Sequence, residues 1–132
     1  MALAIHYIIV DGHNQEDPML YSEHFDEKLH PLTDARIPEN YAEVIPSDTE
    51  IFSFMNRLFD AAALSAECGI ITMVYINRCI QYTDLAVHAS NWKRVLLGGI
   101  LMASKVWDDQ VRQPYDSPYD SPYVHLATPL SD

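Results

Sequence analysis

Apolar residues are densest at residues 95–103, where nine positions pass without a charge. This run is far shorter than the roughly 20 apolar residues that a membrane-spanning helix needs, so it predicts a buried core segment. Ser90 precedes it with a side-chain oxygen that can cap free amide groups, and a helix over about 91–107 follows. Because apolar residues cover the whole circumference of this helix, we expect other helices to enclose it.

A glycine pair lies in the middle of the same helix. Gly98 and Gly99 each cost about 1 kcal/mol of helix stability relative to alanine, which favours a close approach of a second helix to the backbone. The alternative is a pair that is merely tolerated. Gly98, Leu101, Lys105 and Asp108 share one side of the helix, since separations of three and four residues bring side chains together. We expect the glycines to be buried against a neighbouring helix and Lys105 to reach out beyond them.

Capping signals predict two further helices. Residues 47–50 read Ser-Asp-Thr-Glu, a capping box of the form S-x-x-E, and begin a helix over about 48–63. One face of that helix is apolar at helical spacing and consists of Ile51, Phe52, Met55, Leu58, Phe59 and Ala62. A second cap at Ser65 begins an apolar helix over about 66–82. Together with the helix at 91–107, these segments predict an all-α helical bundle.

The segments that flank these helices are less regular. Residues 2–10 contain enough β-branched side chains for a strand, but their apolar spacing also fits a helical stripe, which we favour. Residues 22–29 predict a short acidic helix, and residues 31–46, with three prolines, predict an extended linker on the body. Residues 114–123 read PYDSPYDSPY, and their prolines exclude a helix. The predicted organisation is an N-terminal arm (1–46), a helical body (47–110) and an irregular tail (111–132).

Charge is unevenly distributed along the chain. The 132 residues include 19 acidic and 8 basic side chains, which gives a net charge of −11. Residues 1–50 carry a net −9, residues 51–107 carry +2 and residues 108–132 carry −4. An acidic arm and tail around a slightly basic centre repel phosphate backbones, so we expect no nucleic-acid binding.

Terminal signals and cysteines indicate the compartment. The first residues lack the basic region of a signal peptide, and Ala2 excludes N-myristoylation, so we expect no direct membrane anchor. Cys68 and Cys79 fall on one predicted helix, roughly 16 Å apart, which is beyond the reach of a disulfide. We therefore expect a reduced, intracellular protein of the cytoplasm, the nucleus or both.

Residues for catalysis or metal binding do not cluster in the sequence. The six histidines lack metal-ligand spacing, and the two cysteines form no C-x-x-C pair. There is no G-x-S-x-G motif and no phosphate-binding glycine loop. Asp108 and Asp109 point about 100° apart on a helix, which favours a solvated helix end over a carboxylate pair. We predict no catalytic residue, no metal, no cofactor and no enzyme activity.

Several stretches resemble the cyclin box, and they are most similar to the cyclin Y group of PCTAIRE-kinase cyclins. Residues 75–78 (YINR) and 101–105 (LMASK) look like parts of the second and third helices of the box. Residues 90–94 (SNWKR) and 103–110 (ASKVWDDQ) read nearly like the signature of the cyclin Y group. The resemblance extends over about residues 3–110.

The resemblance implies a regulatory subunit that docks on the activation helix of a cyclin-dependent kinase of the PCTAIRE or PFTAIRE type. Within that family, the lysine that matches Lys105 pairs with a glutamate of the fifth box helix, and both contact the kinase. The predicted kinase interface is therefore Lys105, Trp107, Asp108 and Asp109. Without the family, a lysine that extends into solvent at a helix C-terminus would be the simpler interpretation of Lys105.

Two departures from the family change these expectations. Asn77 stands where many cyclins have an acidic residue, and the tail stands where the fourth and fifth helices are expected, including the glutamate partner of Lys105. We therefore expect a cyclin box truncated after its third helix, with self-association or dependence on a bound kinase as the consequence. The alternative function is a truncated interaction module or competitor without a kinase-activating role. The tail also holds three candidate sites for proline-directed kinases, although such dipeptides are ordinary turn residues too: Ser117, Ser121 and Thr128.

Overall fold

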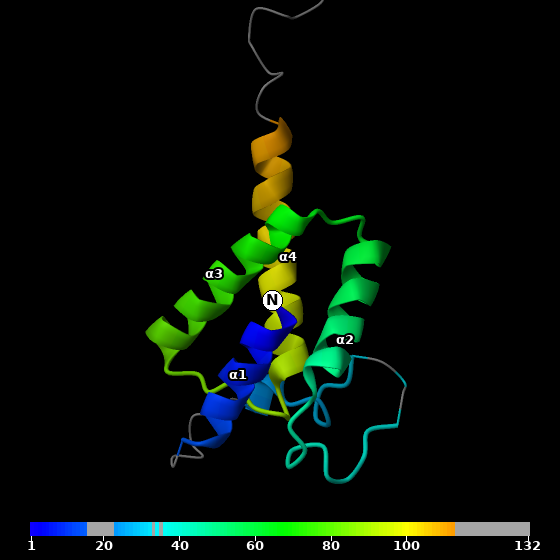
Figure 1. Cartoon of the computed structure of the whole chain (residues 1–132), viewed down its shortest axis with the longest axis vertical. Coiled ribbons are helices and arrows are strands. Elements are labelled where there is room, and N and C mark those ends of the chain that lie inside the picture. The colour runs from blue at the N-terminus through cyan, green and yellow to red at the C-terminus, as the bar shows by residue number, and fades with distance from the viewer. Residues whose placement is uncertain (16–22, 33, 35, 113–132) are drawn as a thin grey trace, which may run out of the picture.

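The computed structural model describes residues 1–15, 23–32, 34 and 36–112, with side chains placed as far as Trp107 (Figure 1). Every regular element within these ranges is helical: α1 (Ala2–His13), the 3-10 turn η2 (Glu23–Phe25), α2 (Asp48–Ala61), α3 (Ala66–Thr83) and α4 (Trp92–Arg112). The predicted all-α fold is confirmed, and α1 shows that the N-terminal segment is a helix. The last helix continues beyond its predicted end at residue 107.

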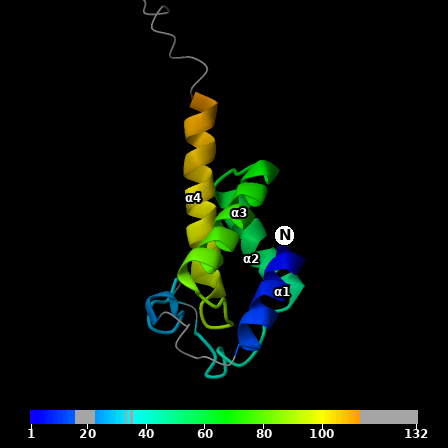
Figure 2. The same cartoon turned by 90° about the vertical axis from the view of Figure 1, so that its left-hand side faces the viewer.

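One apolar core joins the four α-helices. Helices α1, α2 and α3 lie on the same side of α4, as the two views in Figures 1 and 2 show. Apolar side chains at helical spacing on each helix point into this space, together with two from the loop before α4. The buried side chains of this core are Ile5, Ile9, Ile51, Met55, Ile76, Leu85, Val87, Trp92, Val95, Leu96 and Ile100.

Within the described part of the chain, helix α4 is covered on one side only, so the prediction that other helices enclose it is wrong there. Leu96 and Ile100 are buried, whereas Leu101 and Met102 are 59% and 52% exposed. The last turns of α4 also extend past the ends of the neighbouring helices (Figure 2). An apolar circumference predicts burial on all sides only if enough helices are present to cover it, and the other three helices share one face.

The two glycines of α4 have different surroundings. A Cβ atom on Gly99 would lie 3.0 Å from Ile76 Cγ1 and 3.2 Å from Thr72 Cγ2, so α3 approaches the backbone closely there. A Cβ atom on Gly98 would meet no heavy atom within 4 Å, and Gly98 is exposed. The predicted close approach is therefore confirmed for Gly99 and wrong for Gly98, because only one of them faces α3.

The predicted caps of α2 and α3 are placed correctly, but only one forms its side-chain bond. Ser47 Oγ accepts a hydrogen bond from the Glu50 amide at 3.2 Å, as the capping box predicts. Ser65 is the N-cap residue of α3, yet its hydroxyl accepts no hydrogen bond from the helix amides.

Asn91 directly precedes helix α4, in the place where Ser90 was predicted as the cap. The Val95 amide donates to the Asn91 carbonyl at 3.1 Å, which is the first helical bond. Asn91 Oδ1 accepts from the His88 amide at 2.7 Å, and Asn91 Nδ2 donates to the Ala86 carbonyl at 3.0 Å. Asn91 is only 1% exposed, so its amide satisfies buried backbone groups of the preceding loop and fixes the entry into α4.

The arm contains one 3-10 turn where a short acidic helix over residues 22–29 was predicted. After it, the Asp26 carboxylate accepts hydrogen bonds from the amides of Lys28 and Leu29 and caps a separate turn, which the His30 amide closes on the Asp26 carbonyl at 3.0 Å. Residues 36–46 contain no regular helix or strand, but residues 39–43 form turns, so the prediction of an extended linker is wrong for that part.

The end of α1 packs against the loop that precedes α4. A Cβ atom on Gly12 would overlap the carbonyl oxygen of Val87, so a larger residue requires the backbone to move. The rings of His13 and His88 stack with centroids 3.5 Å apart, and His13 Nε2 accepts a hydrogen bond from the Ala89 amide at 3.1 Å. Burial lowers the pKa of His13, while burial and the charge of His13 lower the pKa of His88 to about 4. Both rings are therefore neutral at pH 7.

Candidate functional site

The second half of α4 presents a surface that no other described helix covers. Gly98, Leu101 and Lys105 are exposed and share one side of the helix, as their spacing predicts. Among the residues that the structure describes, no carboxylate forms an ion pair with Lys105. A cation beside exposed apolar side chains suits a protein partner that supplies both a carboxylate and an apolar contact.

An apolar groove of about 260 Å³ lies between α3 and α4, next to this surface. Gly98 leaves space in it, because a Cβ atom there would meet no heavy atom within 4 Å. The groove connects exposed Met102 with Phe25 of η2, so its apolar lining extends the uncovered surface of α4. Its lining consists of Phe25, Tyr75, Ile76, Cys79, Leu85, Arg94, Val95, Gly98, Gly99 and Met102.

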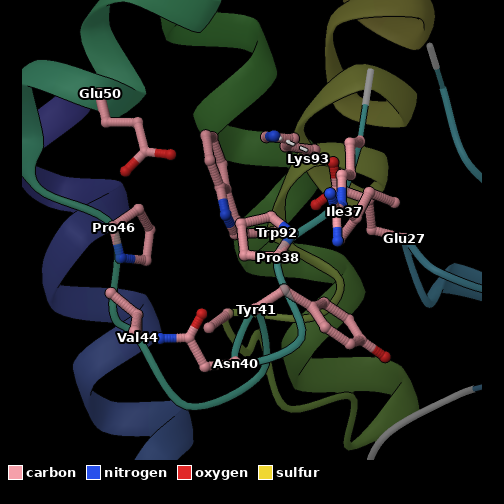
Figure 3. Close-up of a pocket in the computed structure, with 12 residues that line it drawn as sticks. Glu27, Ile37, Pro38, Asn40, Tyr41, Val44, Pro46, Glu50, Trp92 and Lys93 are labelled. Atoms are coloured by element: carbon pink, nitrogen blue, oxygen red, sulfur yellow. Dashed lines mark hydrogen bonds and ion pairs between the residues drawn. The ribbon is translucent and has the colours of Figure 1, made fainter. Parts of the chain in front are cut away.

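A second cavity, of about 290 Å³, lies between the arm and the start of α4 (Figure 3). Lys93 Nζ forms an ion pair with Glu27 Oε1 at 2.9 Å and lies 5.6 Å from the centroid of the Trp92 ring. The cavity is therefore lined by both polar and apolar side chains, and the charge of Lys93 is already neutralised by Glu27 of the arm. Its lining consists of Glu27, Arg36, Ile37, Pro38, Asn40, Tyr41, Val44, Pro46, Glu50, Ala89, Trp92 and Lys93.

A comparison with known families decides the class of this helical bundle. The family model described as Cyclin matches residues 5–119. The chain belongs to the cyclin family. Cyclins are regulatory subunits without catalytic activity of their own, and they generally bind cyclin-dependent kinases. No solved structure gives a significant match.

Two of the predicted interface residues of this cyclin differ in exposure. Lys105 is exposed and Trp107 is partly buried, and two residues of helix correspond to a rotation of about 200°, so the two positions lie on different sides of α4. Their shared contact with a kinase stays a prediction. Asp108 and Asp109 belong to α4, but their side chains are outside the described residues. The candidate phosphosites are also outside them: Ser117, Ser121 and Thr128.

Sequence reasoning missed the groove and the cavity of this cyclin. Arm residues line both of them. Phe25 lines the groove together with residues of α3, and Tyr41 lines the cavity together with the first residues of α4. No local pattern predicts contacts between such distant segments. The exposure of Gly98 had a usable signal. It shares a helix side with Lys105, and a side that carries a charge faces solvent or a partner more often than a core.

No helix in the described part of the cyclin is long and apolar enough to cross a bilayer, and no group of three or more His, Cys, Asp or Glu side chains there could hold a metal ion. Cys68 and Cys79 both carry free thiols.

Proposed function

We propose that this chain is a cyclin Y-like regulatory subunit that binds a cyclin-dependent kinase of the PCTAIRE or PFTAIRE type and regulates its activity. The observation that carries the proposal is Lys105, exposed on the uncovered side of α4 without a carboxylate partner among the described residues. The resemblance of residues 103–110 to the cyclin Y signature supports the choice of kinase type.

The surface around Lys105 offers two kinds of interaction to a kinase. Leu101 and Met102 are more than half exposed, and their burial would remove apolar area from water. Lys105 would then find a carboxylate or carbonyl on the kinase. An ion pair that is desolvated by the surrounding apolar contacts contributes far more than one on a solvated rim.

Charge reversal tests this contact directly. Purified full-length chain is immobilised, and the dissociation constant of a purified PCTAIRE-type kinase is measured for the unmodified chain, Lys105→Glu and Lys28→Glu. Lys28 is an exposed lysine of the arm and gives a matched control. We expect Lys105→Glu to weaken binding at least about 30-fold, or about 2 kcal/mol, and Lys28→Glu to change it less than about twofold. Equal capture by the unmodified chain and Lys105→Glu would exclude the proposed contact.

Binding without activation is the second candidate function. The observation that favours it is the exposed apolar surface of Leu101 and Met102, which can hold a partner without reorganising it. Kinase activity on a peptide substrate, measured at saturating chain, separates the two candidates. A rise in activity supports an activating cyclin, whereas unchanged activity with displacement of a cyclin Y-type activator supports a competitor.

We also propose an intracellular location, in the cytoplasm, the nucleus or both. The free thiols of Cys68 and Cys79 support it, because such thiols persist in a reducing compartment. Fractionation of cells that express the tagged chain, with a secreted protein as the control, tests this location.

A further inference from the structure

Tyr41 connects two parts of the arm through its hydroxyl group. We name residues 36–46 the strap and residues 26–30 the clamp turn. The Tyr41 hydroxyl in the strap lies 3.0 Å from each carboxylate oxygen of Asp26 in the clamp turn, and it donates to this carboxylate. Among the described residues, this is the only hydrogen bond between the strap and the clamp turn.

The clamp turn is fixed to the start of α4 independently of the strap. The Glu27 amide donates to the Ser90 carbonyl at 2.8 Å, and the Glu27 carboxylate pairs with Lys93 at 2.9 Å. The guanidinium of Arg94 donates to the His30 carbonyl. The clamp turn is therefore held by its own contacts, and the middle of the strap is attached to it through Tyr41.

The middle of the strap can leave this position, whereas its end stays on the body. Ile45 packs against the core, and the Pro46 carbonyl accepts a hydrogen bond from His6 Nδ1 at 2.9 Å. A cavity of about 290 Å³ separates the strap from Trp92, and Figure 3 shows Tyr41 on the strap side of that space. Glu39 and Glu43 are exposed, and the strap backbone consists of turns. Tyr41 itself is partly exposed, so an enzyme can reach its hydroxyl once the strap moves away from Asp26.

We propose that Tyr41 is a site of tyrosine phosphorylation and that phosphorylation releases the strap from the clamp turn. In the transfer, Tyr41 Oη forms a bond to the γ-phosphorus of ATP on a protein-tyrosine kinase. The bond from that phosphorus to the β,γ-bridging oxygen breaks, ADP leaves, and the phenolic proton passes to the base of the kinase. The site lies apart from the Lys105 surface and does not depend on the proposed function.

The charges around Tyr41 explain the release. The phosphate removes the hydroxyl proton that Asp26 accepts, and it adds about −1.5 to −2 charges at this position. Burial, the hydrogen bond to Asp26 and the negative charges of Asp26 and Glu27 already raise the pKa of Tyr41, so a further anion is disfavoured here. Two cations of the cavity lining, Arg36 and Lys93, would oppose release by pairing with the phosphate, although Lys93 already pairs with Glu27. The experiment below distinguishes this outcome.

Hydrogen exchange measures the release in the full chain. Phosphotyrosine is incorporated at position 41, and the amide exchange of strap residues such as Glu43 and Val44, which donate to the Asn40 carbonyl, is compared with that of the unmodified chain. We expect strap amides to exchange at least about tenfold faster and α3 amides to be unchanged. Tyr41→Phe, which loses the hydrogen bond without adding charge, should give a smaller increase.

Phosphotyrosine at Tyr82 is the matched control, because that side chain on α3 is 84% exposed and lies outside the arm. It should leave strap exchange unchanged. Incubation of the full chain with a broad-specificity tyrosine kinase domain and MgATP should place phosphate on both Tyr41 and Tyr82 by mass spectrometry. Phosphate on Tyr82 without phosphate on Tyr41 would overturn the proposal. Unchanged or slower strap exchange in the chain modified at Tyr41 would overturn it as well.

Discussion

Alanine substitutions at the two glycines of α4 should have opposite effects on stability. Alanine is favoured over glycine in a helix interior by about 1 kcal/mol, and this gain applies to both positions. At Gly98 the new methyl group meets no heavy atom within 4 Å, so we expect Gly98→Ala to stabilise the fold by about 1 kcal/mol. At Gly99 the methyl group would lie 3.0 Å from Ile76 Cγ1, and overpacking of this kind costs about 1–3 kcal/mol. We expect Gly99→Ala to destabilise the fold by about 1 kcal/mol after the helix gain is subtracted.

Urea unfolding at 25 °C, followed by circular dichroism, measures both free energies of unfolding. The two variants should differ by about 2 kcal/mol at an unchanged dependence on urea concentration. A difference below about 0.5 kcal/mol would refute the reasoning, because it would mean that α3 does not pack on Gly99.

Gly12→Ala extends the same comparison to a backbone neighbour. Its methyl group would overlap the Val87 carbonyl oxygen, and a backbone atom yields less than the end of a flexible side chain. We therefore expect the largest loss of the three, at least about 2 kcal/mol. A loss no greater than that of Gly99→Ala would show that the loop before α4 can move away from α1.

The remaining predictions concern pH and association. The folded pKa of His88 is about 4 and that of His13 is also lowered, so the unfolded chain binds protons first as pH falls below 6.5. The free energy of unfolding should be constant above pH 6.5 and fall by about 1–2 kcal/mol between pH 6.5 and pH 5, a figure reduced for the partial exposure of both rings. Urea titrations at several pH values should show a smaller fall for His13→Gln. Sedimentation velocity should show concentration-dependent association for the unmodified chain and a monomer for Leu101→Glu/Met102→Glu, whereas a monomer for both would exclude association through α4.

Local patterns were sufficient to predict α2, α3 and α4. The capping box at Ser47 and the apolar spacing after it predict where α2 starts, because these interactions form within a few residues of one another. The same holds for the apolar runs of α3 and α4. Asn91 shows the limit of such patterns. Its role depends on the folded loop from Ala86 to His88, and the neighbouring Ser90 has equal capping chemistry in the sequence.

Contacts between distant segments could not be predicted in this way. Gly12 lies against Val87, and His13 stacks on His88, although neither pair follows from helical periodicity. The uncovered side of α4 is a similar case. Periodicity identifies Leu101 and Met102 as apolar, but the side that the other helices cover depends on how the whole bundle packs. The position of Lys105 was predictable, because its side of the helix follows from its spacing to Gly98 and Leu101.

The two ends of α4 have different surroundings, and this difference leads to a last prediction. Its first turn is fixed by the clamp turn through Lys93, whereas Lys105 lies on the uncovered half, about 18 Å further along the helix axis. Leu96 and Ile100 lie between Lys93 and Lys105, and their buried side chains fix this part of α4 to the core. Release of the strap should therefore leave the Lys105 surface in place. We expect the chain phosphorylated at Tyr41 to capture a PCTAIRE-type kinase with the same dissociation constant as the unmodified chain. If phosphorylation at Tyr41 lowers the affinity for the kinase tenfold or more, and Lys105→Glu also weakens binding as expected, then the kinase contacts the strap as well as the Lys105 surface.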